Sequence, residues 1–559
     1  MADGAGCRFT FEGRPFSARA GQSLAAALIE AGERGFRETA KGGERSVFCG
    51  MGVCQDCLVE VDGAPNVRAC MTAPREGMAV RRQSAAVDLT RLGPAPEGRL
   101  IEEAPEIAVL GGGAGGLSAA RAAAEAGADV LVIDERGVAG GQYYKQAAAS
   151  FALDAQQREG GALIAAATAA GARLLSGVEV WGAFEGPVLY ASRGTDALVI
   201  RPKRLIVATG AYERPAMVPG WQLPGVMTTG AAQTLWRSYR TLPGERVLVA
   251  GSGPLNAQVA LELARGGARV VGLLERAPSP LGRLKAAMAM VAADPRLAAK
   301  GLAMMAALFA RRVPVQHDAR LMRVDAAPGG LNVTVDVAGT TAVHGVDAVL
   351  MNDGFHPSNE VLRLLGATFA WDAQFRQLRP HRTERGETSV PGLFAVGDCC
   401  GLGGAPAAVA EGAIAGAAAA SDLGHTVAAP AWADRQLARA RRFQEALWTV
   451  YAHGAEGLAD VPGETLLCRC EEVSVATLDA ALAEGAGDIG AAKRATRIGM
   501  GRCQGRYCGP LLAALMAERR GEAMDERAFF APRPPIKPVA ISSVLAAEAA
   551  HVAGDDAAV

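Results

Sequence analysis

Short runs of apolar residues that end in glycine-rich turns recur along the 559-residue chain. Residues 107–110 precede one such turn, and residues 247–250 precede a second about 140 residues later. The first turn opens an alanine-rich stretch with helical spacing, residues 117–126. A buried strand, a glycine loop and a helix form the opening unit of a dinucleotide-binding fold. The pattern therefore predicts an α/β core of two doubly wound domains, the second inserted within the first.

The rest of the chain is divided by its composition. A cysteine-rich loop is preceded by alternating polar and apolar residues at 8–11 and a helical run at 24–31, and it is followed by a strand at 58–61. A Pro/Gly-rich stretch at 84–105 has the composition of a linker. An apolar strand at 392–396 returns late enough to close the first domain, and amphipathic helical segments follow Pro430. We expect a module at 1–90, the first dinucleotide domain at 105–240 and 345–425, the second at 241–344, a small helical module at 430–525, and a tail at 526–559.

Composition narrows the possible environments. About half of the residues are hydrophobic, about a fifth are charged, and the net charge is −1 with no long basic block. This balance does not favour nucleic acid or an anionic membrane surface as a partner. The first residues lack the basic and apolar regions of a signal peptide, and no apolar run is long enough for a membrane span. We expect a soluble, cytoplasmic chain.

Eight of the eleven cysteines fall into two groups. Cys49, Cys54, Cys57 and Cys70 have the spacing C-x4-C-x2-C-x12-C, with small residues between the first three. Three thiolates in a tight loop and a fourth from the next strand are suited to a [2Fe–2S] cluster, which loop amides would stabilise. The alternative is a structural zinc site, although zinc sites usually combine two short knuckles.

The second group lies near the C-terminus and consists of Cys468, Cys470, Cys503 and Cys508. Two close pairs in a small helical domain resemble the [2Fe–2S] site of bacterioferritin-associated ferredoxins. That type often has C-x2-C as its second pair, whereas this chain has C-x4-C. Zinc is again the alternative ligand.

The first glycine loop has the sequence Gly111-Gly112-Gly113-Ala114-Gly115-Gly116. Gly111, Gly113 and Gly116 occupy the fingerprint positions that allow the tight turn, the approach of the pyrophosphate and the packing of helix on strand. The following helix N-terminus would supply amides to the phosphates. Asp134 and Glu135 end the next strand, and we expect one of them, with Asp134 favoured by spacing, to bind the ribose hydroxyls.

Three later motifs strengthen the flavoprotein interpretation. They are Gly140-Gly141-Gln142, Ala208-Thr209-Gly210 and Gly397-Asp398, the last two at strand ends. With the first loop they resemble the two-dinucleotide-binding-domain, glutathione-reductase-like flavoproteins, which implies bound FAD. A disulfide reductase is excluded because residues 142–390 contain no cysteine, and bridging of the adjacent Cys399 and Cys400 would be strained.

The second glycine loop departs from the fingerprint. Gly251 and Gly253 are present, but Asn256 stands at the third glycine position, and Glu275 is the candidate ribose-binding acid. This unit could bind NAD(H), or it could keep the fold without an exchangeable nucleotide. An acid rather than an arginine at this position argues against NADP.

The order of these motifs resembles one family: the dinucleotide-binding alpha subunits of hydrogen cyanide synthase, opine oxidases, dye-linked proline and hydroxyproline dehydrogenases, and heterotetrameric sarcosine oxidase. The resemblance rests on residues 49–70, 111–142, 219–226, 354–357, 392–398, 468–472 and 499–508. It implies an N-terminal ferredoxin-like [2Fe–2S] domain, fused here although separate in some relatives, and a small helical C-terminal [2Fe–2S] domain.

The resemblance also implies a division of labour. A separate D-amino-acid-oxidase-like beta subunit would oxidise a C–N bond on its own FAD, and electrons would cross to this chain, in some members through an FMN at the subunit interface. They would leave for a quinone, a dye or a protein acceptor. In some members the alpha subunit holds NAD or ATP in place of FAD. We assign no catalytic acid or base, and expect His356 to be a surface or loop histidine.

Two other functions fit parts of the sequence. One is a self-sufficient NADH-dependent reductase that binds its reductant at the second glycine loop. The other is a nucleotide-binding scaffold subunit that turns over nothing.

Overall fold

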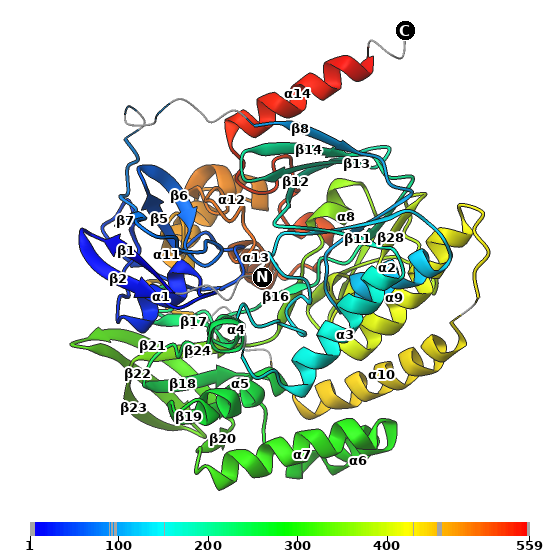
Figure 1. Ribbon diagram of the computed structural model, residues 1–559. Helices are drawn as coiled ribbons and strands as arrows, with labels where there is room; N and C mark the ends of the chain where they lie inside the picture. The colour runs from blue at the N-terminus through cyan, green and yellow to red at the C-terminus, as the bar shows by residue number, and fades with distance from the viewer. Residues whose placement is uncertain are drawn as a thin grey trace.

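The computed structural model describes residues 6–88, 90, 93, 98–149, 151–428, 430–454 and 461–555. The N-terminal module is a five-stranded sheet in the order β2-β1-β7-β5-β6, with helix α1 packed on it (Figure 1). The sheet begins with a hairpin because Glu12 and Gly13 adopt positive φ at its turn. Its elements are β1 (Cys7–Phe11), β2 (Arg14–Ala18), α1 (Leu24–Glu30), β3 (Arg37–Glu38), β4 (Glu44–Arg45), β5 (Leu58–Val61), β6 (Ala64–Arg68) and β7 (Ala79–Arg82).

The first dinucleotide domain has a parallel sheet in the order β11-β10-β9-β15-β28. Its strands are continuous apolar runs because helices cover the sheet. The late strand joins the sheet beside β15, as the sequence predicted. The elements are β9 (Ile107–Leu110), α2 (Ala114–Glu125), β10 (Val130–Asp134), α3 (Ala155–Ala169), β11 (Arg173–Ser176), β15 (Arg204–Val207), β28 (Leu393–Ala395) and α9 (Gly404–Ser421).

The second dinucleotide domain has its own parallel sheet in the order β17-β24-β18-β19-β20. A three-stranded antiparallel sheet, β21 (Ala319–Ala327), β22 (Gly330–Val337) and β23 (Thr340–Val346), follows it. The short pair β16 (Ala211–Glu213) and β25 (Phe355–Pro357) lies at the connections between the two domains. The elements of the parallel domain are β17 (Val226–Thr228), α4 (Thr229–Tyr239), β18 (Arg246–Gly251), α5 (Pro254–Arg265), β19 (Arg269–Glu275), α6 (Leu284–Ala293), α7 (Pro295–Ala310), β20 (Val315–His317) and β24 (Ala348–Asn352).

Several predicted boundaries differ from the structure. Strands β17 and β24 hydrogen-bond within the second sheet, so this domain extends beyond the expected 241–344 at both ends. The expected linker contains a strand, β8 (Leu100–Glu103), which completes the four-stranded sheet of β12 (Glu179–Phe184), β13 (Val188–Arg193) and β14 (Asp196–Ile200). These pairings join segments far apart in sequence, which local composition does not reveal.

The C-terminal region also differs from its predicted limits. Helix α10 (Ala431–Val450) packs on α9 and α6 rather than on the cysteine module. That module consists of β29 (Leu466–Cys468), β30 (Val473–Ser474), α11 (Val475–Ala483), α12 (Ile489–Thr496) and α13 (Cys508–Arg520). The expected tail contains helix α14 (Ile541–Asp555), which packs on β14 and β8. Among the described residues, no helix combines the length and apolarity that crossing a bilayer requires.

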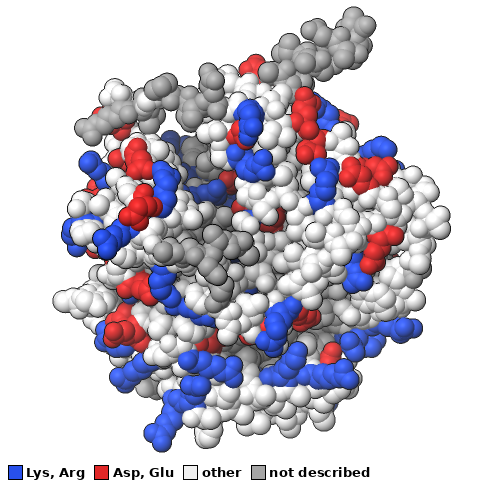
Figure 2. Space-filling model, viewed as in Figure 1, with Lys and Arg blue, Asp and Glu red and all other residues white. Residues whose placement is uncertain are grey.

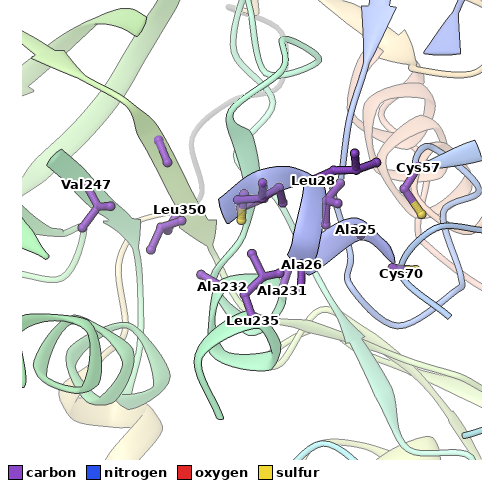
Figure 3. Packing of buried hydrophobic residues seen from close by; sticks show 14 of the residues in the cluster. Ala25, Ala26, Leu28, Cys57, Cys70, Ala231, Ala232, Leu235, Val247 and Leu350 are labelled. Atoms are coloured by element: carbon purple, nitrogen blue, oxygen red, sulfur yellow. The ribbon is translucent and has the colours of Figure 1, made fainter. Parts of the chain in front are cut away.

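One hydrophobic cluster joins the N-terminal module to the second dinucleotide domain. Figure 3 shows Ala25, Ala26 and Leu28 of α1 beside Ala231, Ala232 and Leu235 of α4. Cys57 and Cys70 belong to the same cluster. A Cβ at Gly50 would lie 2.9 Å from the Cα of Ala231, so the cysteine loop also contacts α4 closely. The N-terminal module is therefore packed rigidly on the core.

Helices α2 and α9 cross at very short range. A Cβ at Gly412 would lie 2.1 Å from the carbonyl oxygen of Gly115, and one at Gly416 would lie 2.1 Å from that of Ala119. No Cβ approaches backbone so closely, so only glycine fits at these positions. This crossing fixes the helix that begins at the first glycine loop.

We therefore expect Gly416→Ala to destabilise the protein by about 1–3 kcal/mol through overpacking. The matched control is Gly301→Ala in α7, where a Cβ meets no atom within 4 Å. The control should gain up to about 1 kcal/mol from helix propensity. Thermal unfolding midpoints measure both changes, and a Gly416→Ala protein as stable as the wild type would contradict the close crossing.

Candidate cofactor sites

The N-terminal cysteines are gathered by one loop and the end of a hairpin. Cys49, Cys54 and Cys57 lie between β4 and β5, Cys70 follows β6, and all four are buried. The amides of Met51 and Cys54 donate to the sulfur of Cys49 at 3.5 and 3.4 Å. Burial opposes ionisation of Cys49, but hydrogen bonds from the Cys54 thiol and these amides lower its pKa to about 7. The loop thus favours the thiolate form of Cys49.

The C-terminal cysteines are gathered by a strand end and a helix start. Cys468 ends β29, Cys508 begins α13, and Cys470 and Cys503 lie in the turns between, with their sulfurs 3.9 Å apart. A Cβ at Gly501 would lie 2.3 Å from that of Cys470, which explains the glycine before the second pair. The longer C-x4-C gap accommodates the turn that leads into α13.

The donor sets fit binuclear clusters. In the described part of the chain, no three Cys, His, Asp or Glu side chains gather where they could hold a single metal ion. The thiols approach in pairs instead, Cys49 with Cys54, Cys57 with Cys70, Cys468 with Cys508 and Cys470 with Cys503. A [2Fe–2S] cluster takes two thiolates on each of two irons. The pairing of the thiols is therefore compatible with such a cluster in each set.

The two cysteine sets meet in the structure. One pocket is lined from both modules by Cys54, Asp56, Cys468, Arg469, Cys470, Cys503, Tyr507 and Cys508. The buried ring of Phe48, beside Cys49, packs edge-on against that of Tyr507, beside Cys508, with centroids 5.1 Å apart. The sequence separates the two sets by about 400 residues and contains no signal of this contact.

The first glycine loop has the shape of a dinucleotide cradle. A Cβ at Gly111 would lie 2.4 Å from the oxygen of Ala208, and one at Gly116 only 1.9 Å from the oxygen of Gly111. A Cβ at Gly113 would instead meet only the Cα of Gly141, at 3.9 Å. Gly113 therefore borders open space at the N-terminus of α2, where a pyrophosphate would bind. Ala114 and Gly115 follow in the first turn of that helix.

The two candidate ribose acids have different partners. Asp134 accepts hydrogen bonds from the amides of Gly112 at 2.7 Å and Arg136 at 2.8 Å, so its carboxylate faces the glycine loop. Glu135 forms an ion pair with Lys537, which comes from the C-terminal region. Asp134 is consequently the better candidate for the ribose hydroxyls.

The other predicted motifs of the first site surround this loop. The amide of Gly140 donates to the oxygen of Gly112 at 2.7 Å, which brings Gly141 and Gln142 beside the loop. The amide of Ser358 donates to the oxygen of Gly210 at 2.9 Å, and the Thr209 hydroxyl donates to the oxygen of Ser358. Asp398, after Gly397, accepts from the amides of Gly403 and Gly404 at 3.0 Å and thereby orients the start of α9.

An aromatic contact connects the strand after Gly210 to the cysteine sets. Tyr212, two residues beyond Gly210, is buried, and its ring centroid lies 5.5 Å from that of Tyr507. Tyr212 also packs against His356, with ring centroids 5.8 Å apart. His356 is buried, so the expectation of a surface or loop histidine is wrong. Burial and the nearby Arg214 lower the pKa of His356 well below its ordinary value.

The second glycine loop is covered by the end of α10. Trp448 lies against Gly253, where a Cβ would be 3.4 Å from the indole, and the Ser252 hydroxyl donates to the oxygen of Tyr451 at 3.2 Å. Glu275 accepts from Ser252 at 2.8 Å and from the amide of Gly253 at 3.1 Å. Glu275 thus faces its loop as Asp134 faces the first loop, and the cover by Trp448 and Tyr451 is what distinguishes the second loop from the first.

Asn256 replaces the third glycine of the second loop without disrupting it. Its amide donates to the oxygen of Asn352 at 2.9 Å, and its oxygen accepts from the Thr229 hydroxyl at 2.7 Å. Asn256 thus cross-links α5, β24 and α4. A Cβ at Gly251 would lie 1.8 Å from the same Asn352 oxygen, and the residue has a positive φ, so both packing and backbone conformation require glycine there.

Comparison with known proteins identifies three regions. The chain matches a 2Fe-2S iron-sulfur cluster binding domain at residues 5–85, a pyridine nucleotide-disulphide oxidoreductase at 105–412, and a sarcosine oxidase A3 domain at 463–549. An opine oxidase subunit of Rhizobium meliloti is 31% identical over 454 residues, which cover 78% of this chain and 97% of the relative.

Hydrogen cyanide synthase of Pseudomonas aeruginosa matches through two of its subunits. Subunit HcnB is 31% identical over 61% of this chain and 75% of its own length. Subunit HcnA is 42% identical over 76 residues, which cover 14% of this chain and 73% of that subunit. Among solved structures, L-proline dehydrogenase from P. horikoshii covers 97% of this chain and 98% of its own, with a TM-score of 0.72 and 21% identity, and so shares the fold.

The open space at Gly113 allows nucleotide binding to be tested separately from folding. We expect Gly113→Ala to fold with an unchanged unfolding midpoint in the nucleotide-free protein, because its methyl group meets no protein atom closer than 3.9 Å. The methyl group would occupy the space of the pyrophosphate and weaken flavin binding by about tenfold or more. Flavin absorbance per chain and affinity of the nucleotide-free protein measure this loss.

Gly116→Ala is the contrasting variant, since its methyl group would lie 1.9 Å from the Gly111 oxygen and should lower the unfolding midpoint itself. Full flavin retention by Gly113→Ala would show that the dinucleotide does not bind at this loop.

Proposed function

Since the chain belongs to the family of flavin and iron–sulfur oxidoreductase subunits that includes this opine oxidase component, we propose that it is the electron-transfer subunit of a multi-subunit amine, amino-acid or opine dehydrogenase. A D-amino-acid-oxidase-like partner would remove two electrons from a C–N bond on its own flavin. This chain would receive them and pass them, one at a time, to a quinone, dye or protein acceptor.

The chain's own residues supply three cofactor sites in this proposal. Gly111, Gly113, Gly116 and Asp134 would hold FAD, and the two cysteine sets would each hold a [2Fe–2S] cluster. A flavin exchanges one or two electrons and a [2Fe–2S] cluster exchanges one, so together they convert a two-electron oxidation into single-electron transfers. The protein positions the groups and excludes water from them.

The observation that carries the proposal is the meeting of the two cysteine sets in one pocket, together with an aromatic contact to the strand that follows Gly210. Tyr507 immediately precedes Cys508 and touches two aromatic rings, that of Phe48 beside Cys49 and that of Tyr212 in β16, at the connection between the two dinucleotide domains. An electron carrier needs its redox sites close together because transfer slows steeply with distance. A scaffold subunit would have no need to gather eight thiols, seven of them buried, in two sets that meet.

A candidate surface for the partner subunit lies on α6 and α7, at the lower edge of the molecule in Figure 1. Figure 2 shows this edge as largely uncharged, with Lys and Arg along it. Residues 276–312 contain seven Lys or Arg and a single acid, Asp294. An apolar patch with a basic margin suits a partner with an acidic rim. The exposed apolar side chains are Leu281, Leu284, Met288, Val291, Leu302 and Phe309.

The proposal is tested by the metal and nucleotide content of the anaerobically co-purified complex. We expect about four iron atoms and four sulfides in this chain, two reduced-cluster EPR signals and releasable FAD. Cys57→Ser and Cys508→Ser should each remove about half of the iron and a different EPR signal. Cys7→Ser, outside both sets, should change neither. Zinc in place of iron, or release of NAD or ATP without flavin, would refute the respective cofactor assignment.

The alternative of an NADH-dependent reductase is disfavoured by the covered second glycine loop. We expect no saturable bleaching of the flavin by NADH in the wild type, because Trp448 and Tyr451 occupy the approach to Gly253 and Ser252. Trp448→Ala removes part of this cover and should allow weak NADH binding. Trp432 is an exposed tryptophan of the same helix, and Trp432→Ala should not differ from the wild type. Rapid NADH-dependent bleaching of the unaltered chain would favour the alternative.

A further inference from the structure

One buried ion pair joins the two cysteine loops. Asp56 lies between Cys54 and Cys57, and Arg469 lies between Cys468 and Cys470. The Nε and Nη2 atoms of Arg469 are both 2.8 Å from Oδ2 of Asp56. Their side chains are 5% and 1% exposed, so water and salt screen the charges much less than at the surface.

Arg469 is held from every side. Its guanidinium carbon lies 3.7 Å from the ring centroid of Phe48 and 4.9 Å from that of Trp221, and its Nη1 donates to the Trp221 carbonyl oxygen. Trp221 is itself fixed, because its indole donates to the oxygen of Leu466 at 2.7 Å. Such a planar, stacked cation leaves little freedom for another residue type.

Asp56 is equally constrained. Its second oxygen accepts from Nη2 of Arg37 at 2.8 Å, and its backbone oxygen accepts from Nε of the same arginine at 3.1 Å. Arg45 extends the network, donating to the backbone oxygen of Arg469 and to the carboxylate of Glu472, each at 3.0 Å. Three arginines and two acids are therefore concentrated where the cysteine sets meet.

We infer that Arg469 and Asp56 are positioning residues shared by both cluster sites, so that the two clusters behave as one electrostatically coupled pair. This inference rests on the proposed function, because it requires clusters in both cysteine sets. The cation lies between two sites that gain negative charge on reduction, and it stabilises the reduced state of both. The carboxylate has the opposite effect on both.

A purely structural ion pair would serve only to dock the modules. The two roles differ in a measurable way. If the pair only docks the modules, removing Asp56 or Arg469 would weaken the interface in both cases. If the charges act on both clusters, removing one of them shifts the midpoint potentials of both clusters, and the sign of the removed charge sets the direction. Each partner keeps another contact when the other is removed, Asp56 with Arg37 and Arg469 with the Trp221 oxygen, so both variants can fold.

The test uses redox titrations of the full complex followed by low-temperature EPR. In the wild type, full reduction should broaden or split the signals relative to half-reduced protein, because two nearby paramagnetic clusters interact. Arg469→Met should shift both midpoint potentials to more negative values, and Asp56→Asn should shift both to more positive values. Arg469→Lys should keep the charge but lose the stacked fork, and should lie between the wild type and Arg469→Met.

Arg497→Gln is the matched control, because Arg497 belongs to the same module and pairs with Glu471 at an exposed position. It should leave the N-terminal cluster unaffected. Two clusters with independent signals at full reduction, or shifts confined to the cluster on the mutated module, would overturn the inference while leaving the proposed function intact. Absence of one or both clusters from wild-type protein would instead be a failure of the proposed function. Iron content reports which case applies, including for a variant that fails to assemble.

Discussion

The contact of the two cysteine loops around Arg469 is the constraint on which the organisation of this molecule depends. A guanidinium group this deeply buried must be paired and hydrogen-bonded, because an uncompensated charge in the interior is very costly. Asp56 supplies the pairing from the N-terminal module, and Phe48 and Trp221 enclose the group. The modules can hardly separate without exposing or orphaning these charges. Modules that are distant in sequence are therefore held at one fixed distance.

The dinucleotide folds supply the frame for that junction. Tyr212 leaves the first domain directly after the strand-end motif that contains Gly210, and reaches Tyr507. The cluster of α1 and α4 then fixes the N-terminal module on the second domain. In this second domain the end of α10 covers the glycine loop. The chain thus contains the same fold twice: the first glycine loop borders open space at Gly113, whereas the second is covered by Trp448 and Tyr451.

Much of the local architecture followed from sequence. The strand, glycine loop and helix at Gly111 are specified by residues near one another, because the tight turn and close packing admit only glycine at Gly111 and Gly116. The grouping of the cysteines was equally visible, since each loop contributes its thiols within a few residues. The domain limits were less accurate. β17, β24 and β8 join their sheets through pairings between distant segments, which short-range patterns do not encode.

The sequence by itself determined which residue types are available for each cofactor, because a cluster needs thiolates and a pyrophosphate needs bare backbone at close range. Tertiary structure alone decided how these sites relate. It turned Asp134 toward the loop but paired Glu135 with Lys537, buried His356 where a loop residue was expected, and placed Trp448 over the second nucleotide site. It also brought Cys54 and Cys468 into one pocket. Such contacts arise from the packing of whole domains, so no local pattern in the chain records them.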